Sequence, residues 1–201
     1  MAETSREFLK QSARHSATSF TRGWALMRRH GPDQVQFWFI ALIVGIAAGF
    51  AALGFRYLVA QTQTFVYGTD DVILATVART LPWYWVLIVP IIGGLIVGQL
   101  LHHFTLDARV RAVADVIDGA ALRNGRVEIK AGIASAFASL ITLSTGGSTG
   151  REGPVVHLGA MISTWVSDLI HANGITGRDL LGCAVAAAVS ASFNTPIAGA
   201  L

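Results

Sequence analysis

Two long uncharged apolar runs dominate the first half of the chain. No Asp, Glu, Lys or Arg occurs at residues 34–55 or at residues 80–106. A helix of 22 residues is about 33 Å long, enough to cross a hydrocarbon core of about 30 Å. The pattern therefore predicts two membrane-crossing helices, at residues 34–66 and 80–104. The first continues past Arg56, so it must tilt or project beyond the bilayer.

The second half of the chain is rich in small residues. Residues 131–150 and 180–201 are uncharged and dominated by Ala, Ser, Gly and Thr, which allow helices to approach closely inside a bundle. The apolar stretch after Arg151 and Glu152 is too short to span the membrane and is typical of a half-helix that begins inside it. We expect shorter helices at residues 113–122, 127–144, 152–167, 177–190 and 195–201.

Composition and charge favour an integral membrane protein over a soluble or nucleic-acid-binding one. Apolar residues make up 53% of the chain and charged residues 13%, whereas a soluble domain carries about 25% charged residues. Six of the 15 Lys and Arg residues lie in residues 1–33. This segment is predicted to form a basic amphipathic helix on the cytoplasmic membrane surface, followed by a transmembrane domain at residues 34–201. No cleavable signal peptide is expected.

Four glycines and a proline interrupt the apolar pattern at residues 146–154, GGSTGREGP. Non-helical backbone at membrane depth is tolerated only where it is buried in protein or lines a watery cavity. Pro154 suits the first turn of a helix, so a helix is predicted to begin near Glu152 with free N–H groups. Such N–H groups and the helix dipole favour an anion. An ionised Glu152 can occupy the anion's position and leave it when protonated. The alternative is a structural Arg151–Glu152 pair at a membrane edge.

A second break follows at Asn194, Thr195 and Pro196. Either polar residue can cap a helix that has Pro196 in its first position. Two helix starts inside apolar segments are the expected signature of broken-helix transporters. No metal site is predicted from His102, His103 and Asp107, because adjacent histidines point to different helix faces, and no organic cofactor is expected.

The two breaks carry a resemblance to a known family. Gly150-Arg151-Glu152-Gly153-Pro154 matches the GREGP motif of the chloride channel and chloride/proton antiporter (CLC) family, and residues 191–199, ASFNTPIAG, are similar to its AAFNAPLAG stretch. The resemblance covers about residues 20–201. It implies an all-α polytopic membrane protein with an inverted-repeat fold, of which only the first half-repeat is present.

The same resemblance implies a function and a site. Chloride or a similar small anion would cross a bacterial inner membrane through a voltage-gated channel or a chloride/proton antiporter, with the N-terminus cytoplasmic. Glu152 would be the gating glutamate, and the backbone around Gly150, Arg151, Gly153 and Pro154 would help form the outer anion site. The family works as a homodimer in membrane lipid with a pore in each subunit. No enzymatic activity and no nucleic-acid partner are implied.

The chain departs from the family in two respects. Arg111 stands where the family's first motif has an anion-coordinating serine, although residues 114–118 match the tail of that motif. Arg111 either supplies positive charge to an inner anion site or faces the cytoplasm. In addition, the family chain continues well beyond Leu201, so this chain is expected to be a fragment or a truncated product.

Two rival functions can be stated from the sequence. Residues 146–150 also match G-x-S-x-G, the nucleophile elbow of hydrolases, which would make Ser148 the nucleophile of an intramembrane serine hydrolase with His157 or His171 as base. The residues before this pattern indicate a helix, whereas an elbow follows a strand. The other rival is a non-conducting membrane fragment or assembly subunit that uses its small-residue helices only to bind a partner.

Overall fold

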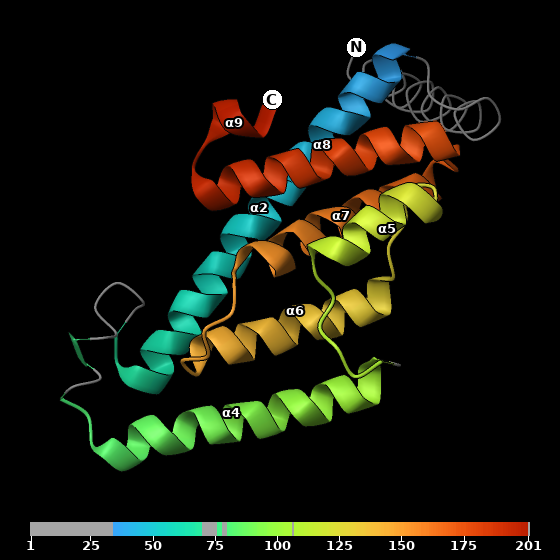
Figure 1. Ribbon diagram of the computed structural model, residues 1–201. Coiled ribbons are helices and arrows are strands. Elements are labelled where there is room, and N and C mark those ends of the chain that lie inside the picture. The colour runs from blue at the N-terminus through green and yellow to red at the C-terminus, as the bar shows by residue number, and fades with distance from the viewer. Residues whose placement is uncertain (1–33, 70–75, 78–79, 106, 201) are drawn as a thin grey trace, which may run out of the picture.

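The computed structural model describes residues 34–69, 76–77, 80–105 and 107–200, and these residues form helices and no β-strand. The long helix α2 (Gln34–Tyr67) runs diagonally across the other helices, and α4 (Trp83–Phe104) lies at one edge (Figure 1). The remaining helices are α5 (Val113–Leu122), α6 (Ile129–Ser144), α7 (Glu152–Leu169), α8 (Gly174–Phe193) and α9 (Pro196–Ala200). The all-α prediction is confirmed, and the basic helix predicted at residues 1–33 lies outside the described residues.

Helix α6 begins at Ile129 rather than at residue 127, and single residues explain the larger differences between observed and predicted bounds. Pro82 precedes the first residue of α4, which therefore begins at Trp83 rather than at residue 80. Asn173 caps α8 by accepting a hydrogen bond from the Thr176 N–H at 2.8 Å, so α8 begins at Gly174 rather than at residue 177. Asn194 has a φ of 55° and ends α8. It is therefore a C-cap, and the suggestion that it caps the last helix is wrong, although Pro196 does begin α9.

Only one stripe of α2 is buried. Val44, Ala48, Ala52, Phe55 and Val59 recur at the three- and four-residue spacing of a helix face, and all five are at most 5% exposed. Of the most apolar window in each helix, only 17% in α2 and 11% in α4 is buried. Both helices have the length and composition needed to cross a membrane, as predicted, and their exposed apolar surface suits contact with lipid or with further protein.

Helix α7 lies at the centre of the bundle and contacts α2, α5, α6 and α8. A Cβ atom added to Gly159 would lie 3.0 Å from the Ala184 carbonyl oxygen and 3.1 Å from the Ala188 Cβ. Small residues therefore let α7 and α8 pack backbone to backbone, as the composition predicts. In α4 a similarly close approach occurs at Gly93, which faces Thr145, whereas Gly94 and Gly98 have nothing within 4 Å of an added Cβ.

Candidate functional site

The glycine-rich loop joins the end of α6 to the start of α7. Gly146 takes the left-handed backbone conformation, with a φ of 89°, and the Gly147 N–H donates to the Thr142 carbonyl at 2.8 Å. Helix α7 then begins at Glu152 with Pro154 buried in its first turn, which confirms the predicted helix start. No side chain caps this helix. The first-turn N–H groups therefore lack both an intrahelical acceptor and a side-chain cap.

The Glu152 side chain is exposed and turns back toward the loop that precedes its helix. A Cβ atom added to Gly150 would lie 2.7 Å from Glu152 Oε2. Glycine at position 150 therefore leaves the space that the carboxylate occupies. The structure thus brings Gly150, Arg151, Glu152, Gly153 and Pro154 together at one uncapped helix N-terminus, where the helix dipole favours negative charge.

The first turns of α5 and α7 lie side by side (Figure 1). A Cβ atom added to Gly153 would lie 3.8 Å from the Ala112 Cβ, just before α5. The two N-termini differ in one respect. The Ala112 N–H donates to Asp115 Oδ2 at 2.8 Å, so a carboxylate of the chain already lies at the start of α5.

Arg111 is buried in a network of ion pairs. Its residue is 8% exposed, and its guanidinium lies 3.1 Å from Asp107, 3.3 Å from Asp115 and 3.0 Å from Glu128. Burial acts to lower the pKa of Arg111, but the hydrogen bond to Asp107 and the three carboxylate charges together raise it above its ordinary value. Arg111 is therefore a neutralised, buried cation. It is not a solvated surface residue.

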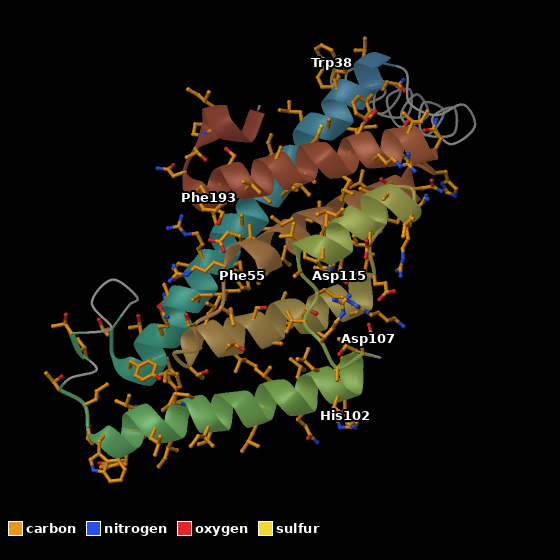
Figure 2. All side chains as sticks on the ribbon, in the orientation of Figure 1. Trp38, Phe55, His102, Asp107, Asp115 and Phe193 are labelled. Carbon is orange, nitrogen blue, oxygen red and sulfur yellow. The ribbon has the colours of Figure 1, made fainter. Side chains whose placement is uncertain are left out.

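Further arginines extend this network. Arg109 pairs with Asp115 at 2.6 Å, and Arg123 pairs with Glu128 at 2.6 Å. We call the following side chains the ion-pair cluster: Asp107, Arg109, Arg111, Asp115, Asp118, Arg123, Arg126 and Glu128. Figure 2 shows Asp107 and Asp115 directed into the same region beside α5. The cluster lines a cavity of about 260 Å³, together with Val127 and the imidazole of His157.

Polar residues of α2 hold the end of α6, where the site loop begins. Gln63 Nε2 donates to the Leu143 carbonyl at 3.1 Å, and the Tyr67 hydroxyl donates to the Thr145 carbonyl at 2.9 Å. The sequence analysis missed both residues. The signal was available, because two polar side chains four residues apart lie on one face of an apolar helix.

The sequence analysis also assigned no role to Arg56. Its Nη1 donates to the Ser192 carbonyl at 3.5 Å, near the end of α8 and just before the second break. An arginine within an apolar membrane-length helix is by itself a signal of function. The structure thus places a cation beside the break at Asn194 and Pro196.

The local structure does not fit the rival hydrolase site at Ser148, and the adjacent histidines, for which no metal site is predicted, lie exposed on α4. Ser148 is exposed and follows helix α6, so the strand that a nucleophile elbow requires is not present before it. His102 and His103 have ring centroids 5.7 Å apart and exposed side chains. Among the described residues, no group of three or more His, Cys, Asp or Glu side chains could hold a metal ion.

The geometry defines a class: a helical protein with two helices long and apolar enough to cross a membrane and an uncapped helix start at α7. A family model described as voltage gated chloride channel matches residues 93–201. A putative chloride channel protein ClcB-like of Ralstonia nicotianae is 33% identical over 166 residues, covering 81% of this chain and 38% of the relative. A voltage-gated ClC-type chloride channel ClcB of Escherichia coli O81 is 31% identical over 169 residues, covering 81% and 39%.

These similarities show the family. The chain belongs to the voltage-gated chloride channel (CLC) family, and the predicted membership is confirmed. It spans about two fifths of the length of the curated relatives that it matches. No solved structure matches the chain.

Proposed function

We propose that the chain forms part of a transmembrane pathway for chloride or a similar small anion, with Glu152 as its gate. The pathway works as a voltage-gated channel or as a chloride/proton antiporter in a bacterial inner membrane, with the N-terminus on the cytoplasmic side. The relatives carry chloride channel names and come from bacteria. The cytoplasmic assignment is supported by the basic residues that precede α2.

One observation carries the proposal: Glu152 is the first residue of an uncapped helix, and its carboxylate lies over Gly150. When ionised, the carboxylate competes with a halide for the positive end of α7. Protonation removes that charge, and the N–H groups of Glu152 and Gly153 become available to the anion. Because Gly150 has no side chain, the Glu152 carboxylate fits beside it. Pro154 lies in the first turn of the helix, where its missing N–H costs no hydrogen bond.

The surroundings support a pathway between broken helices. The break before Pro196 lies next to α2, where Arg56 contributes a positive charge near the end of α8. A halide approaching this break would benefit from the cation. The exposed apolar faces of α2 and α4 would meet lipid or a second subunit of a homodimer.

The test replaces Glu152 with glutamine and measures chloride efflux from liposomes between pH 4.5 and 7.5. The chain is reconstituted alone and as a chimera that carries the remaining length of the Ralstonia relative. Efflux through the unmutated chimera should rise as pH falls, by up to about tenfold per pH unit, the limiting slope of a one-proton titration. Glu152→Gln should give high efflux without pH dependence, since the amide cannot ionise.

Two further variants sharpen this test. Gly150→Ala should raise efflux at neutral pH, because its Cβ takes the position of the Glu152 carboxylate. Asp179→Asn is the matched control, an exposed carboxylate on α8, and should leave the pH profile unchanged. A pH profile that survives Glu152→Gln would count against the gate and in favour of the structural Arg151–Glu152 pair. If the chimera conducts chloride and the chain alone does not, the chain alone is a non-conducting fragment.

A further inference from the structure

Two buried polar side chains lie on the last turns of α2. Gln63 is 2% exposed and Tyr67 is 8% exposed, although both belong to a helix long and apolar enough to cross a membrane. A buried polar group at membrane depth is costly unless it is hydrogen-bonded within the protein. Leucine and phenylalanine would fill the same space without that cost, so the polar atoms of these two residues point to a role beyond packing.

Both side chains donate to main-chain carbonyls where α6 ends. Figure 1 shows the end of α6 beside the last turns of α2. Gln63 Nε2 lies 3.1 Å from the Leu143 carbonyl oxygen, and the Tyr67 hydroxyl oxygen lies 2.9 Å from that of Thr145. The last carbonyls of a helix lack an intrahelical partner. Helix α2 therefore supplies donors to a helix end that leads directly into the glycine-rich loop.

The residue at this junction is held from two sides. The Thr145 carbonyl accepts from Tyr67 of α2, whereas the Thr145 side chain packs against α4, where a Cβ atom added to Gly93 would lie 2.7 Å from Thr145 Cγ2. The first residue of the loop is close as well, because a Cβ atom added to Gly146 would lie 3.2 Å from the Tyr67 hydroxyl oxygen. The two long helices thus fix the point where the loop begins.

The rest of the loop depends on its ends for its position. Residues 148–150 are exposed, whereas Pro154 is buried in α7. An exposed connection takes its position from the elements that it joins. The Glu152 carboxylate lies against the last part of this connection, since a Cβ atom added to Gly150 would lie 2.7 Å from Glu152 Oε2. A displacement of the end of α6 would therefore move Gly150 relative to the carboxylate.

We propose that Gln63 and Tyr67 are positioning residues for the gate. They fix the end of α6, and through it the glycine-rich loop, so that the ionised Glu152 carboxylate stays in its blocking position. Neither residue touches the anion, and each acts through the main chain of the loop. The inference rests on the proposed function and deepens it, because it names the contacts that keep the gate closed at neutral pH.

The functional test uses chloride efflux through the chimera described above. Tyr67→Phe removes only the hydroxyl, and Gln63→Leu removes the amide at similar size. The ratio of efflux at pH 4.5 to efflux at pH 7.5 should fall by about threefold for each lost hydrogen bond, the factor for an average interhelical bond in a membrane. Tyr57→Phe and Gln61→Leu are matched controls, because these exposed residues of α2 bond to each other at 2.6 Å, and they should leave the ratio unchanged.

A double-mutant cycle separates positioning from a general structural role. In a Glu152→Gln background, Tyr67→Phe should have no further effect on efflux, because no ionised carboxylate remains to be displaced. An equal effect of Tyr67→Phe with and without Glu152 would overturn the proposal. If Gln63→Leu does not fold, as judged by circular dichroism, Tyr67→Phe carries the test.

Hydrogen exchange of the loop amides tests the anchor independently of the gate. In the chimera in detergent micelles, Tyr67→Phe should speed exchange at residues 145–149 by about threefold, whereas Tyr57→Phe should not. Unchanged exchange would overturn the inference whatever the behaviour of Glu152→Gln. Faster exchange with an unchanged efflux ratio would also overturn it, and would leave the gate standing if Glu152→Gln abolishes the pH dependence. Faster exchange with a pH profile that survives Glu152→Gln would instead refute the gate and keep only the anchor.

Discussion

Replacing Gly93 with alanine tests whether close backbone contact holds α4 against α6. Among the described helices, α6 is the principal neighbour of α4. A Cβ atom at position 93 would lie 2.7 Å from Thr145 Cγ2, 2.8 Å from Thr145 Cβ and closer still to Thr145 Oγ1. Gly94 follows on the same helix with open space around an added Cβ, so Gly94→Ala is a matched control.

The expected magnitude combines two opposing effects. Forcing one extra methyl group into a packed contact costs about 1–3 kcal/mol. Alanine regains up to about 1 kcal/mol of helix propensity at either position. Gly93→Ala should therefore lower the free energy of unfolding by up to about 2 kcal/mol, whereas Gly94→Ala should leave it unchanged or raise it slightly. The strain also reaches the site loop, because the Thr145 carbonyl accepts the Tyr67 hydroxyl at 2.9 Å.

The assay is unfolding in mixed micelles with rising SDS fraction, followed by circular dichroism. Thr145→Ala removes Oγ1 and Cγ2, two of the three clashing atoms. In a double-mutant cycle it should therefore recover about 1 kcal/mol of the loss caused by Gly93→Ala. The reasoning fails if Gly93→Ala and Gly94→Ala unfold at the same SDS fraction, or if Thr145→Ala recovers nothing.

Two further predictions use the same measurement. Asn173→Ala removes the N-cap of α8 and should lower the free energy of unfolding by about 1 kcal/mol. Asn173→Asp keeps an acceptor oxygen and should retain most of this stability. Equal losses in the two variants would show that the cap does not stabilise α8. The hydrogen bond from Arg123 at 2.6 Å, despite the opposing effect of burial, holds the pKa of Glu128 below its ordinary value of 4.5. The stability that Glu128 contributes is therefore full above about pH 4.5 and lost as pH falls through the lower folded value. Arg123→Gln should flatten this acid-side loss, and an unchanged pH profile would contradict the assignment.

Most helices could be predicted because their pattern is set by local chemistry. The predicted bounds of α2 and α7 nearly match the observed ones. They follow from the uncharged run after residue 33 and from the short apolar stretch after Glu152. Errors arose where one side chain decides a helix end. Asn173 adds a turn to the start of α8, and a left-handed residue at Asn194 closes that helix instead of opening the next.

The ion-pair cluster could not be predicted in the same way, because its partners are brought together only by the fold. Arg111 meets Glu128 across 17 residues, and Arg126 meets Asp168 across 42. Residues 107–130 show the pattern of a basic loop, in which charges are expected to be solvated. The fold buries Arg111 beside α6, where its backbone N–H donates to Ser135 Oγ at 2.8 Å.

The two adjacent helix starts give the departure at Arg111 a physical meaning. Both first turns direct N–H groups toward the same region, since Gly153 faces Ala112. At α5 the position is already taken by Asp115, which accepts the Ala112 N–H and is itself paired with Arg109 and Arg111. An anion at α5 would have to displace a carboxylate held by three hydrogen-bonded or ionic contacts. At α7 the nearby carboxylate is that of Glu152, which is exposed and, among the described residues, is not ion-paired with a neighbouring arginine. Under the proposed function, the chain therefore concentrates anion binding and its control at the start of α7, and Arg111 serves to keep the start of α5 closed.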